Sequence, residues 1–276
     1  MKFENKVAVV TGAGGVLCSA FAENLAKQGC RVALLDINEQ AIKDVAENIK
    51  NQGGVAGFYP CNVLEKASVE AAHQKILADF GKCDILINGA GGNNPRCTTA
   101  HEYYEAGDED RQDIKTFFNL DKSDFDFVFS LNLMGTLIPT QVFSVDMLNR
   151  DGCIVNISSM NAYTPLTKIP AYSSAKAAVS NFTQWLSVHF AMSGIRVNAI
   201  APGFFVTKQN KDLLFNADGT PTPRTDKILR ATPMGRFGKP EELLGAMDFL
   251  CDNEASGFVT GVVIPVDGGF SAYSGV

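Results

Sequence analysis

The 276-residue sequence has none of the features that direct a chain into a membrane or out of the cell. Residues 1–9 lack the basic start, the long apolar middle and the small-residue cleavage site of a signal peptide. No uninterrupted apolar stretch approaches the roughly 20 residues that a membrane span needs. We therefore expect a cytoplasmic protein that does not associate with membranes.

Paired cysteines and basic blocks are also missing. None of the seven cysteines belongs to a Cys-x-x-Cys pair, and several lie inside apolar runs, so we expect free, buried thiols and no bound metal. The net charge is −6 and the pI is about 5.1, whereas nucleic-acid binding would need a basic surface. Nucleic acid is therefore not an expected partner.

No linker, low-complexity tract or internal repeat divides the chain. Its hydrophobic content of 46% is enough for a large core. Although the length would allow two domains, single α/β domains often reach about 250 residues. We therefore predict one domain over residues 1–276.

Short runs rich in Val and Ile alternate with longer segments of helical periodicity. Most of the short runs are apolar at consecutive positions, as in parallel strands that are buried on both faces. The seven runs are Lys6–Thr11, Arg31–Asp36, Val55–Pro60, Asp84–Asn88, Cys153–Ser158, Arg196–Ala201 and Val262–Val266. The clearest helical segments are Ser19–Gln28, Glu39–Asn51, Phe125–Asn149 and Ser173–Ser193. This alternation predicts an α/β, Rossmann-type, doubly wound parallel sheet of about seven strands with helices on both faces.

Two long segments, 93–123 and 207–233, interrupt the alternation. The first is poorly periodic and leads into a stretch with nine acidic residues from Glu102 to Asp126, and the second contains Pro221, Pro223 and Pro233. Loops of this length in a compact domain are usually lids or binding loops. We expect both to border the substrate, and the first to cover the substrate crevice with its acidic side chains facing solvent.

A glycine-rich turn follows the first predicted strand and opens the next helix. Glycines at such a turn let the backbone approach a pyrophosphate, and the helix N-terminus supplies N–H donors. The residues expected to contact the dinucleotide here are Gly12, Gly14, Gly15, Val16 and Leu17.

Asp36, at the end of the second predicted strand, is expected to select the cofactor. A carboxylate at this position binds the adenosine ribose hydroxyls and repels a 2′-phosphate, and no Arg or Lys stands at 35, 37 or 38 to receive one. The sequence therefore favours NAD over NADP. The alternative is that Asp36 only caps the following helix.

Two further strand ends are expected at the cofactor. The fourth strand ends in Asn88, Gly89 and Ala90, whose small side chains would let it lie against the adenosine ribose side. Asn62 and Val63 follow the third strand and would flank the adenine.

Tyr172 and Lys176 are the strongest candidates for the chemistry. They are four residues apart at the start of a predicted helix and so share one face. A phenol must lose or gain a proton during alcohol–ketone interconversion, and a cation at about 4 Å is worth about 4 kcal/mol at an effective dielectric near 20. We therefore expect Lys176 to lower the pKa of Tyr172. Ser159, at the end of the fifth strand, is expected to donate to the substrate oxygen, with Ser158 as the alternative.

These residues resemble the short-chain dehydrogenase/reductase family over essentially the whole chain. Segments in family order are Thr11-Gly12, Asn88-x-Ala90-Gly91, Asn132, Ser159, Tyr172-x-x-x-Lys176, Pro202-Gly203 and Val266-Asp267-Gly268-Gly269. The resemblance implies a catalytic tetrad of Asn132, Ser159, Tyr172 and Lys176, with Lys176 also on the nicotinamide ribose. It further implies that the nicotinamide is bordered by Pro202, Gly203, Phe205 and Thr207.

The chain departs from the family pattern at four positions. Val16 and Cys18 replace the last two glycines of the first turn, Gly89 replaces an asparagine, and Asn62 replaces a common aspartate. The first two changes bear on the geometry of the pyrophosphate turn rather than on the fold.

Within the family, the chain is most similar to the group that interconverts D-fructuronate plus NADH and D-mannonate plus NAD. A sugar acid needs a cation for its carboxylate and polar partners for its hydroxyls; the candidates are Arg96, Asn161, Lys168 and Gln209. Arg96 and Lys168 could equally be solvated surface residues. Alternative activities are a related keto-sugar-acid or polyol dehydrogenase such as a gluconate 5-dehydrogenase, a 3-oxoacyl-carrier-protein reductase, or dinucleotide binding without catalysis.

Two predicted helices, Phe125–Asn149 and Ser173–Ser193, are too apolar to be fully exposed. The family resemblance implies that partner subunits cover them. We expect a homotetramer, with a dimer as the alternative.

Overall fold

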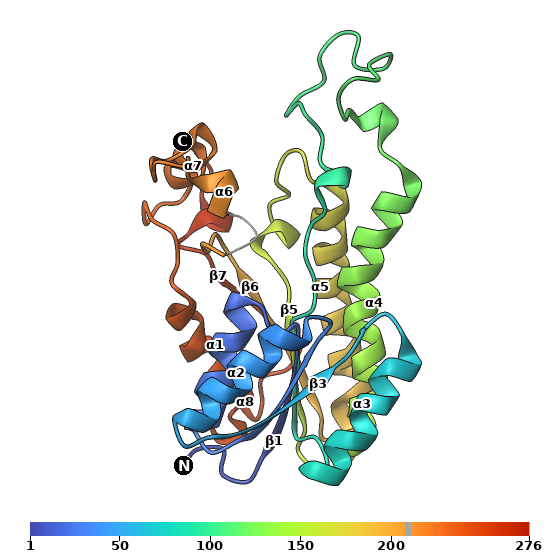
Figure 1. The fold of residues 1–276 in the computed structure, drawn as a ribbon, viewed down its shortest axis with the longest axis vertical. Coiled ribbons are helices and arrows are strands. Elements are labelled where there is room, and N and C mark those ends of the chain that lie inside the picture. The colour runs from blue at the N-terminus through green and yellow to red at the C-terminus, as the bar shows by residue number, and fades with distance from the viewer. Residues whose placement is uncertain (208–210, 276) are drawn as a thin grey trace.

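The computed structural model describes residues 1–207 and 211–275, which form one seven-stranded parallel sheet in the order β3-β2-β1-β4-β5-β6-β7 (Figure 1). The strands are β1 (Val7–Thr11), β2 (Arg31–Asp36), β3 (Val55–Pro60), β4 (Ile85–Asn88), β5 (Cys153–Ile157), β6 (Arg196–Pro202) and β7 (Val263–Val266). The predicted Rossmann-type fold is confirmed, and the predicted strand bounds are correct to within one residue.

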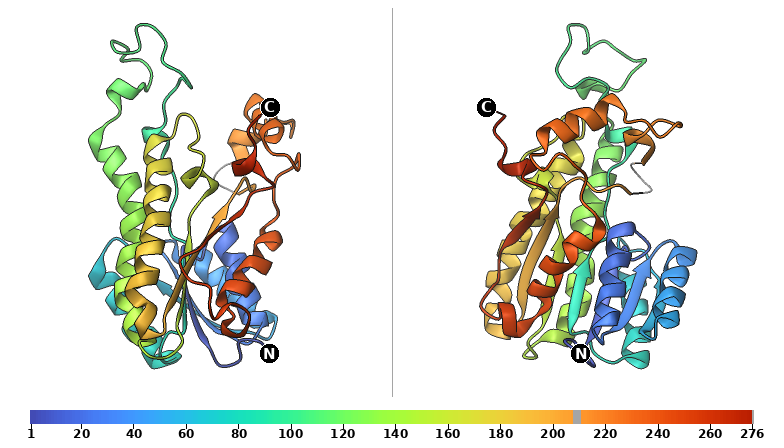
Figure 2. Two further views of the ribbon diagram at one scale, coloured as in Figure 1. Left: turned by 180° about the vertical axis from the view of Figure 1, so that it is seen from behind. Right: turned by 90° about the vertical axis from the view of Figure 1, so that its left-hand side faces the viewer.

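Helices cover both faces of the sheet (Figures 1 and 2). One face carries α1 (Val16–Lys27), α2 (Glu39–Asn51) and α8 (Leu244–Cys251), and the other carries α3 (Lys66–Asp79), α4 (Lys122–Met147) and α5 (Pro170–Phe190). Three short helices, α6 (Lys211–Leu214), α7 (Pro223–Ala231) and α9 (Asn253–Ser256), lie in the C-terminal part of the chain.

The central strand β1 shows why the predicted runs are apolar at consecutive positions. Ala8 and Val10 belong to the core cluster under α1, α2 and α8, whereas Val7 and Val9 belong to the cluster under α3, α4 and α5. Successive strand residues point to opposite faces, so burial of both faces requires an apolar residue at every position.

Helix α4 is long and apolar enough, by length and composition alone, to cross a membrane. Polar residues such as Asn132, Thr136 and Gln141 interrupt its apolar runs, which is why the sequence alone did not indicate it. In this fold half of that stretch is buried inside the protein, where α4 packs between α3 and α5. It is therefore a core helix of the domain.

Some predicted element bounds were wrong. Helices α1, α4 and α5 each begin three residues before the predicted start. For α4 and α5 the reason is that a cap or a proline, rather than apolar residues, sets the first turn, whereas α1 begins directly after Gly15. Asp121 caps α4, and Pro170 opens α5. The segment 207–233, expected to be a loop, contains α6 and α7; Thr222 caps α7 and Pro223 follows it.

The segment 93–121, here called the acidic extension, joins β4 to α4. Hydrogen bonds order it: His101 Nδ1 lies 3.0 Å from Asp108 Oδ1, and the Thr116 hydroxyl donates to the Asp108 carbonyl at 3.0 Å. Its tip rises beyond the N-terminal end of α4, away from the sheet (Figures 1 and 2). The acidic side chains are exposed apart from the buried Asp108, but the tip does not cover the crevice as expected. The two ends of the extension pack against the body, where Cys97 and Leu120 contact the cluster of Val128 and Ala171.

Candidate active site

The turn after β1 leaves an open helix N-terminus at the carboxyl end of the sheet. Gly12 has φ +65°, and a Cβ there would lie 2.8 Å from the backbone nitrogen of Ala90. Gly15 caps α1 without a side-chain hydrogen bond, and the first turn of α1 contains no acidic residue. Unsatisfied N–H groups and the positive end of a helix dipole suit a phosphate.

Asp36 faces this turn. Its Oδ2 accepts a hydrogen bond from the Gly14 N–H at 3.0 Å, and its Oδ1 accepts one from the Asn38 N–H at 2.9 Å. Helix α2 is capped by Asn38, whose side chain accepts from the Ala41 N–H. The alternative that Asp36 only caps α2 is therefore wrong, and its carboxylate lies at the rim of the cleft.

A cleft of about 610 Å³ runs along the carboxyl ends of the strands, within the size range of small-molecule sites. Its wall contains nearly all of the predicted residues: Gly12, Gly14, Gly15, Val16, Leu17, Asp36, Asn62, Val63, Gly89, Ala90, Ser159, Tyr172, Lys176, Pro202, Gly203, Phe205 and Thr207. Sequence reasoning missed the apolar wall residues, because apolar side chains outside a motif give no signal of binding. They are Ile37, Ala41, Cys61, Leu131, Ile157 and Phe204.

Asn88 lies behind this wall rather than in it. Its Nδ2 donates to Thr140 Oγ1 and to Asn156 Oδ1, each at 2.9 Å. The side chain therefore joins β4 to α4 and β5. Its influence on the cleft is indirect, through the position of the Gly89-Ala90 backbone.

Lys176 is buried next to Tyr172. Its Nζ donates to the Ile157 carbonyl at 2.7 Å and lies 5.7 Å from the centroid of the Tyr172 ring. Ser159 Oγ accepts from the Asn161 N–H at 3.2 Å. The Ser158 hydroxyl instead bonds Ser180 Oγ at 2.7 Å and the Lys176 carbonyl at 3.2 Å. Of the two serines, Ser159 is the one whose hydroxyl hydrogen-bonds Tyr172, whereas the Ser158 hydroxyl is used within α5.

The pKa of Tyr172 is raised rather than lowered as expected. Burial raises the pKa of Tyr172, and the hydrogen bond from Ser159 opposes this only in part. Burial also lowers the pKa of Lys176 to about 8. Desolvation penalises both charged forms here, and the Lys176 ammonium is directed at the Ile157 carbonyl. At neutral pH Tyr172 holds its proton and Lys176 is largely charged.

Asn132 is fully buried in α4 and holds the turn that follows β4. Its Oδ1 accepts from the Gly92 N–H at 3.2 Å, and its Nδ2 donates to the Gly92 carbonyl at 2.9 Å. A Cβ on Gly91 would lie 2.6 Å from Asn132 Oδ1 and 3.2 Å from Lys176 Nζ. The Gly91-Gly92 turn therefore lies between the side chains of Asn132 and Lys176, and Asn132 is buried beneath the wall of the cleft.

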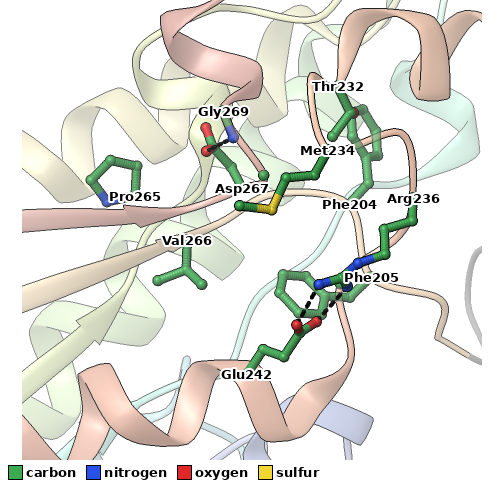
Figure 3. Close-up of a pocket in the computed structure, with 12 residues that line it drawn as sticks. Phe204, Phe205, Thr232, Met234, Arg236, Glu242, Pro265, Val266, Asp267 and Gly269 are labelled. Carbon is green, nitrogen blue, oxygen red and sulfur yellow. Dashed lines mark hydrogen bonds and ion pairs between the residues drawn. The ribbon is translucent and has the colours of Figure 1, made fainter.

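A smaller hollow of about 370 Å³ shares Phe204 and Phe205 with the cleft (Figure 3). Arg236 and Glu242 form a two-point ion pair beside Phe205 at 2.6 and 2.7 Å. The Gly238 N–H donates to the Phe204 carbonyl, and a Cβ at Gly238 would lie 2.4 Å from the Phe205 ring. These contacts hold the aromatic pair that forms one wall of the cleft.

A family model described as enoyl-(acyl carrier protein) reductase matches residues 12–271. The chain belongs to the short-chain dehydrogenase/reductase family. An uncharacterised oxidoreductase of Haemophilus influenzae is 60% identical over 274 residues, covering 99% of this chain and 95% of that protein. The oxidoreductase UxuB of Bacillus subtilis, also uncharacterised, is 53% identical over 272 residues, covering 98% of this chain and 96% of that protein.

A solved structure from Haemophilus influenzae, provisionally described as a D-mannonate oxidoreductase with bound NAD, superposes with a TM-score of 0.95. It is 59% identical, and the match covers 100% of this chain and 98% of the other. As a member of the short-chain dehydrogenase/reductase family, the protein is an oxidoreductase.

Two of the departures from the short-chain dehydrogenase/reductase pattern compensate for one another. Cys18 Sγ lies only 2.1 Å from the position that a Cβ on Gly89 would occupy. The thiol therefore fills the space that the missing side chain at 89 leaves. Burial raises the pKa of Cys18 to about 12, so the thiol remains neutral. All seven cysteines are free and buried, as predicted.

The expected substrate residues are not all brought together. Arg96 is 77% exposed at its side chain and faces Asp124 at 3.8 Å. Asn161 is buried outside the wall of the cleft, and its Oδ1 has no hydrogen-bond partner among residues 1–207 and 211–275. Lys168 lies in the loop before α5, with φ +74°. Gln209 lies outside the described residues.

Proposed function

We propose that the protein is an NAD(H)-dependent oxidoreductase that reduces D-fructuronate to D-mannonate and catalyses the reverse oxidation. The observation that carries this proposal is the presence of Ser159, Tyr172 and Lys176 in the wall of one cleft with Asp36 at its rim. The choice of substrate is supported by the similarity to the Haemophilus influenzae protein described as a D-mannonate oxidoreductase.

The cleft residues fit a dinucleotide. The close approach of Gly12 to Ala90 leaves no space for a side chain, and α1 begins without a side-chain cap, so its first N–H groups remain as donors for the pyrophosphate. Asp36 would hold the adenosine ribose, Asn62 and Val63 the adenine, and Pro202, Gly203, Phe205 and Thr207 the nicotinamide. When bound, NADH supplies the hydride.

The protein's own residues handle the proton. Tyr172 carries a proton at neutral pH and would donate it to the substrate oxygen during reduction. The Ser159 oxygen accepts from the Asn161 N–H, and its O–H hydrogen-bonds Tyr172. A substrate oxygen bound beside Tyr172 would take over that O–H as its second donor. The charge of Lys176 would stabilise the phenolate that Tyr172 becomes, and Asn132 would keep the adjoining turn in position.

A panel of substrates tests the assignment. We expect NADH oxidation, followed by its absorbance, to give a kcat/KM for D-fructuronate at least about 10-fold above those for 5-keto-D-gluconate and D-fructose, because polar pockets reject analogues that leave their groups unpaired. A higher value for 5-keto-D-gluconate would transfer the assignment to a gluconate 5-dehydrogenase. Absence of turnover with D-fructuronate would refute it.

We further propose that the protein is a cytoplasmic homotetramer. Helices α4 and α5 expose large apolar side chains that water would otherwise surround, namely Phe127, Val145, Trp185 and Val188. Sedimentation velocity is expected to give a tetramer for the wild type and a smaller species for Val188→Asp, because a buried unpaired charge opposes association. A monomeric wild type would contradict the proposal.

A further inference from the structure

A group of three cations comes from two segments far apart in the sequence, which both lie at the carboxyl end of the sheet (Figure 1). Lys168 comes from the loop before α5, and Arg224 and Lys227 come from α7. Arg224 and Lys227 are three residues apart and so share one face of that helix. Helix α7 is anchored by its other side, where the Thr225 hydroxyl donates to the Leu214 carbonyl.

One carboxylate already lies among these cations. Glu102, at the base of the acidic extension, accepts a hydrogen bond from Lys227 Nζ at 2.7 Å across 125 residues of sequence. The hydrogen bond from Lys227 lowers the pKa of Glu102, and the charges of Lys168 and Arg224 lower it further. The group therefore accommodates a carboxylate.

The charges in this group do not balance. Among residues 1–207 and 211–275, the side chains of Lys168 and Arg224 make no ion pair or hydrogen bond. Three cations thus share one carboxylate. The excess positive charge favours binding of a second anion, or of an anion that replaces Glu102.

The group is also tied to the catalytic helix. The Thr99 N–H donates to the Lys168 carbonyl at 2.8 Å, which fixes the loop to the base of the extension. Cys97, Val128 and Ala171 form a buried cluster against which Tyr172 packs. Lys168 directly precedes Ile169, the N-cap residue of α5, and Tyr172 lies in the first turn of that helix.

We propose that Lys168, Arg224 and Lys227 form the binding site for the carboxylate of the substrate, and that Glu102 occupies this site until the substrate displaces it. The proposal rests on the proposed function, and it deepens that function by naming the group that separates sugar acids from neutral sugars. A hexonate carries its carboxylate at one end and its reactive carbon near the other, so one molecule can span from Tyr172 to these cations.

The test compares an acid with a neutral polyol of the same carbon skeleton. Isothermal titration of the enzyme–NAD⁺ complex with D-mannonate and D-mannitol measures binding, and kcat/KM for D-fructuronate measures turnover. We expect Lys168→Gln and Lys227→Gln to weaken D-mannonate binding by about 10-fold or more and to leave D-mannitol binding unchanged. Glu102→Gln is expected to tighten D-mannonate binding, because it removes the competing carboxylate.

Matched controls lie at the tip of the same extension. Arg111 pairs with Asp113, and Glu109 accepts from the Tyr104 hydroxyl, so Arg111→Gln and Glu109→Gln make the same charge changes away from the site. Neither is expected to change binding of either ligand. The carboxylate site is wrong if Lys168→Gln affects acid and polyol equally, or if Glu102→Gln weakens acid binding.

The same experiment separates this proposal from the proposed function. A wild type that binds D-gluconate rather than D-mannonate overturns the choice of substrate, and a selective effect of Lys168→Gln on D-gluconate would still support the carboxylate site. A wild type that prefers D-mannitol contradicts both.

Discussion

Replacement of Tyr172 by phenylalanine is expected to lower kcat for D-fructuronate reduction by about 10²–10⁴-fold, the usual contribution of a general acid. The ring and its packing against Cys97, Val128 and Ala171 remain, so NADH binding measured by fluorescence should stay within about twofold. The wild-type pH profile should have opposite slopes in the two directions. Reduction needs the protonated phenol, so its rate falls as the pH rises through the pKa of Tyr172. Oxidation needs the phenolate, so its rate rises over the same pH range.

Tyr163→Phe is the matched control for this prediction. Tyr163 is exposed and its hydroxyl donates to the Val263 carbonyl at 2.7 Å, outside the cleft wall. Loss of this hydroxyl should leave kcat nearly unchanged. If Tyr172→Phe retained reduction near the wild-type rate, another group would have to supply the proton and the proposed chemistry would fail.

The second large effect concerns Asp36 and the choice of cofactor. Wild-type kcat/KM is expected to favour NADH over NADPH by at least about 10²-fold, because a carboxylate about 4 Å from a phosphate costs several kcal/mol at an effective dielectric near 20. Asp36→Asn removes the charge but keeps a carbonyl oxygen that can accept from the Gly14 N–H. This variant should have a lower kcat/KM with NADH and a higher kcat/KM with NADPH. The NADH:NADPH ratio of kcat/KM should therefore fall.

Asp44→Asn provides the comparison for a lost charge on the neighbouring helix. Asp44 is exposed on α2, where it accepts from the Gln40 side chain. Its substitution should leave the NADH:NADPH ratio as in the wild type. A wild-type preference for NADPH would show that the interpretation of Asp36 is wrong.

The sheet could be predicted from sequence because burial on both faces forces apolar residues at consecutive strand positions. The catalytic candidates could be predicted because Tyr172 and Lys176 are one helical turn apart, a spacing that local geometry fixes. Helix starts were less predictable, since Asp121 and Pro170 begin their helices without an apolar signal.

Features that depend on the third dimension were missed. The direction of the Asn88 side chain follows from partners 52 and 68 residues away, Thr140 and Asn156. The pKa of Tyr172 depends on how deeply the phenol is buried and on how far it lies from charged groups, and neither can be inferred from the spacing of residues in the sequence. The pairing of Glu102 with Lys227 joins two segments that the sequence could only mark as long loops.

The contact between Cys18 and Gly89 restricts the order in which mutations can accumulate. In an ancestor with glycine at 18 and asparagine at 89, a first change to Cys18 would force the sulfur to leave the position that it has here, because it would overlap the side chain at 89. The easier order has the change at 89 first or at the same time. A graft of the Thr11–Cys18 turn into a relative that has asparagine at 89 is expected to pack better when Gly89 is transferred with it.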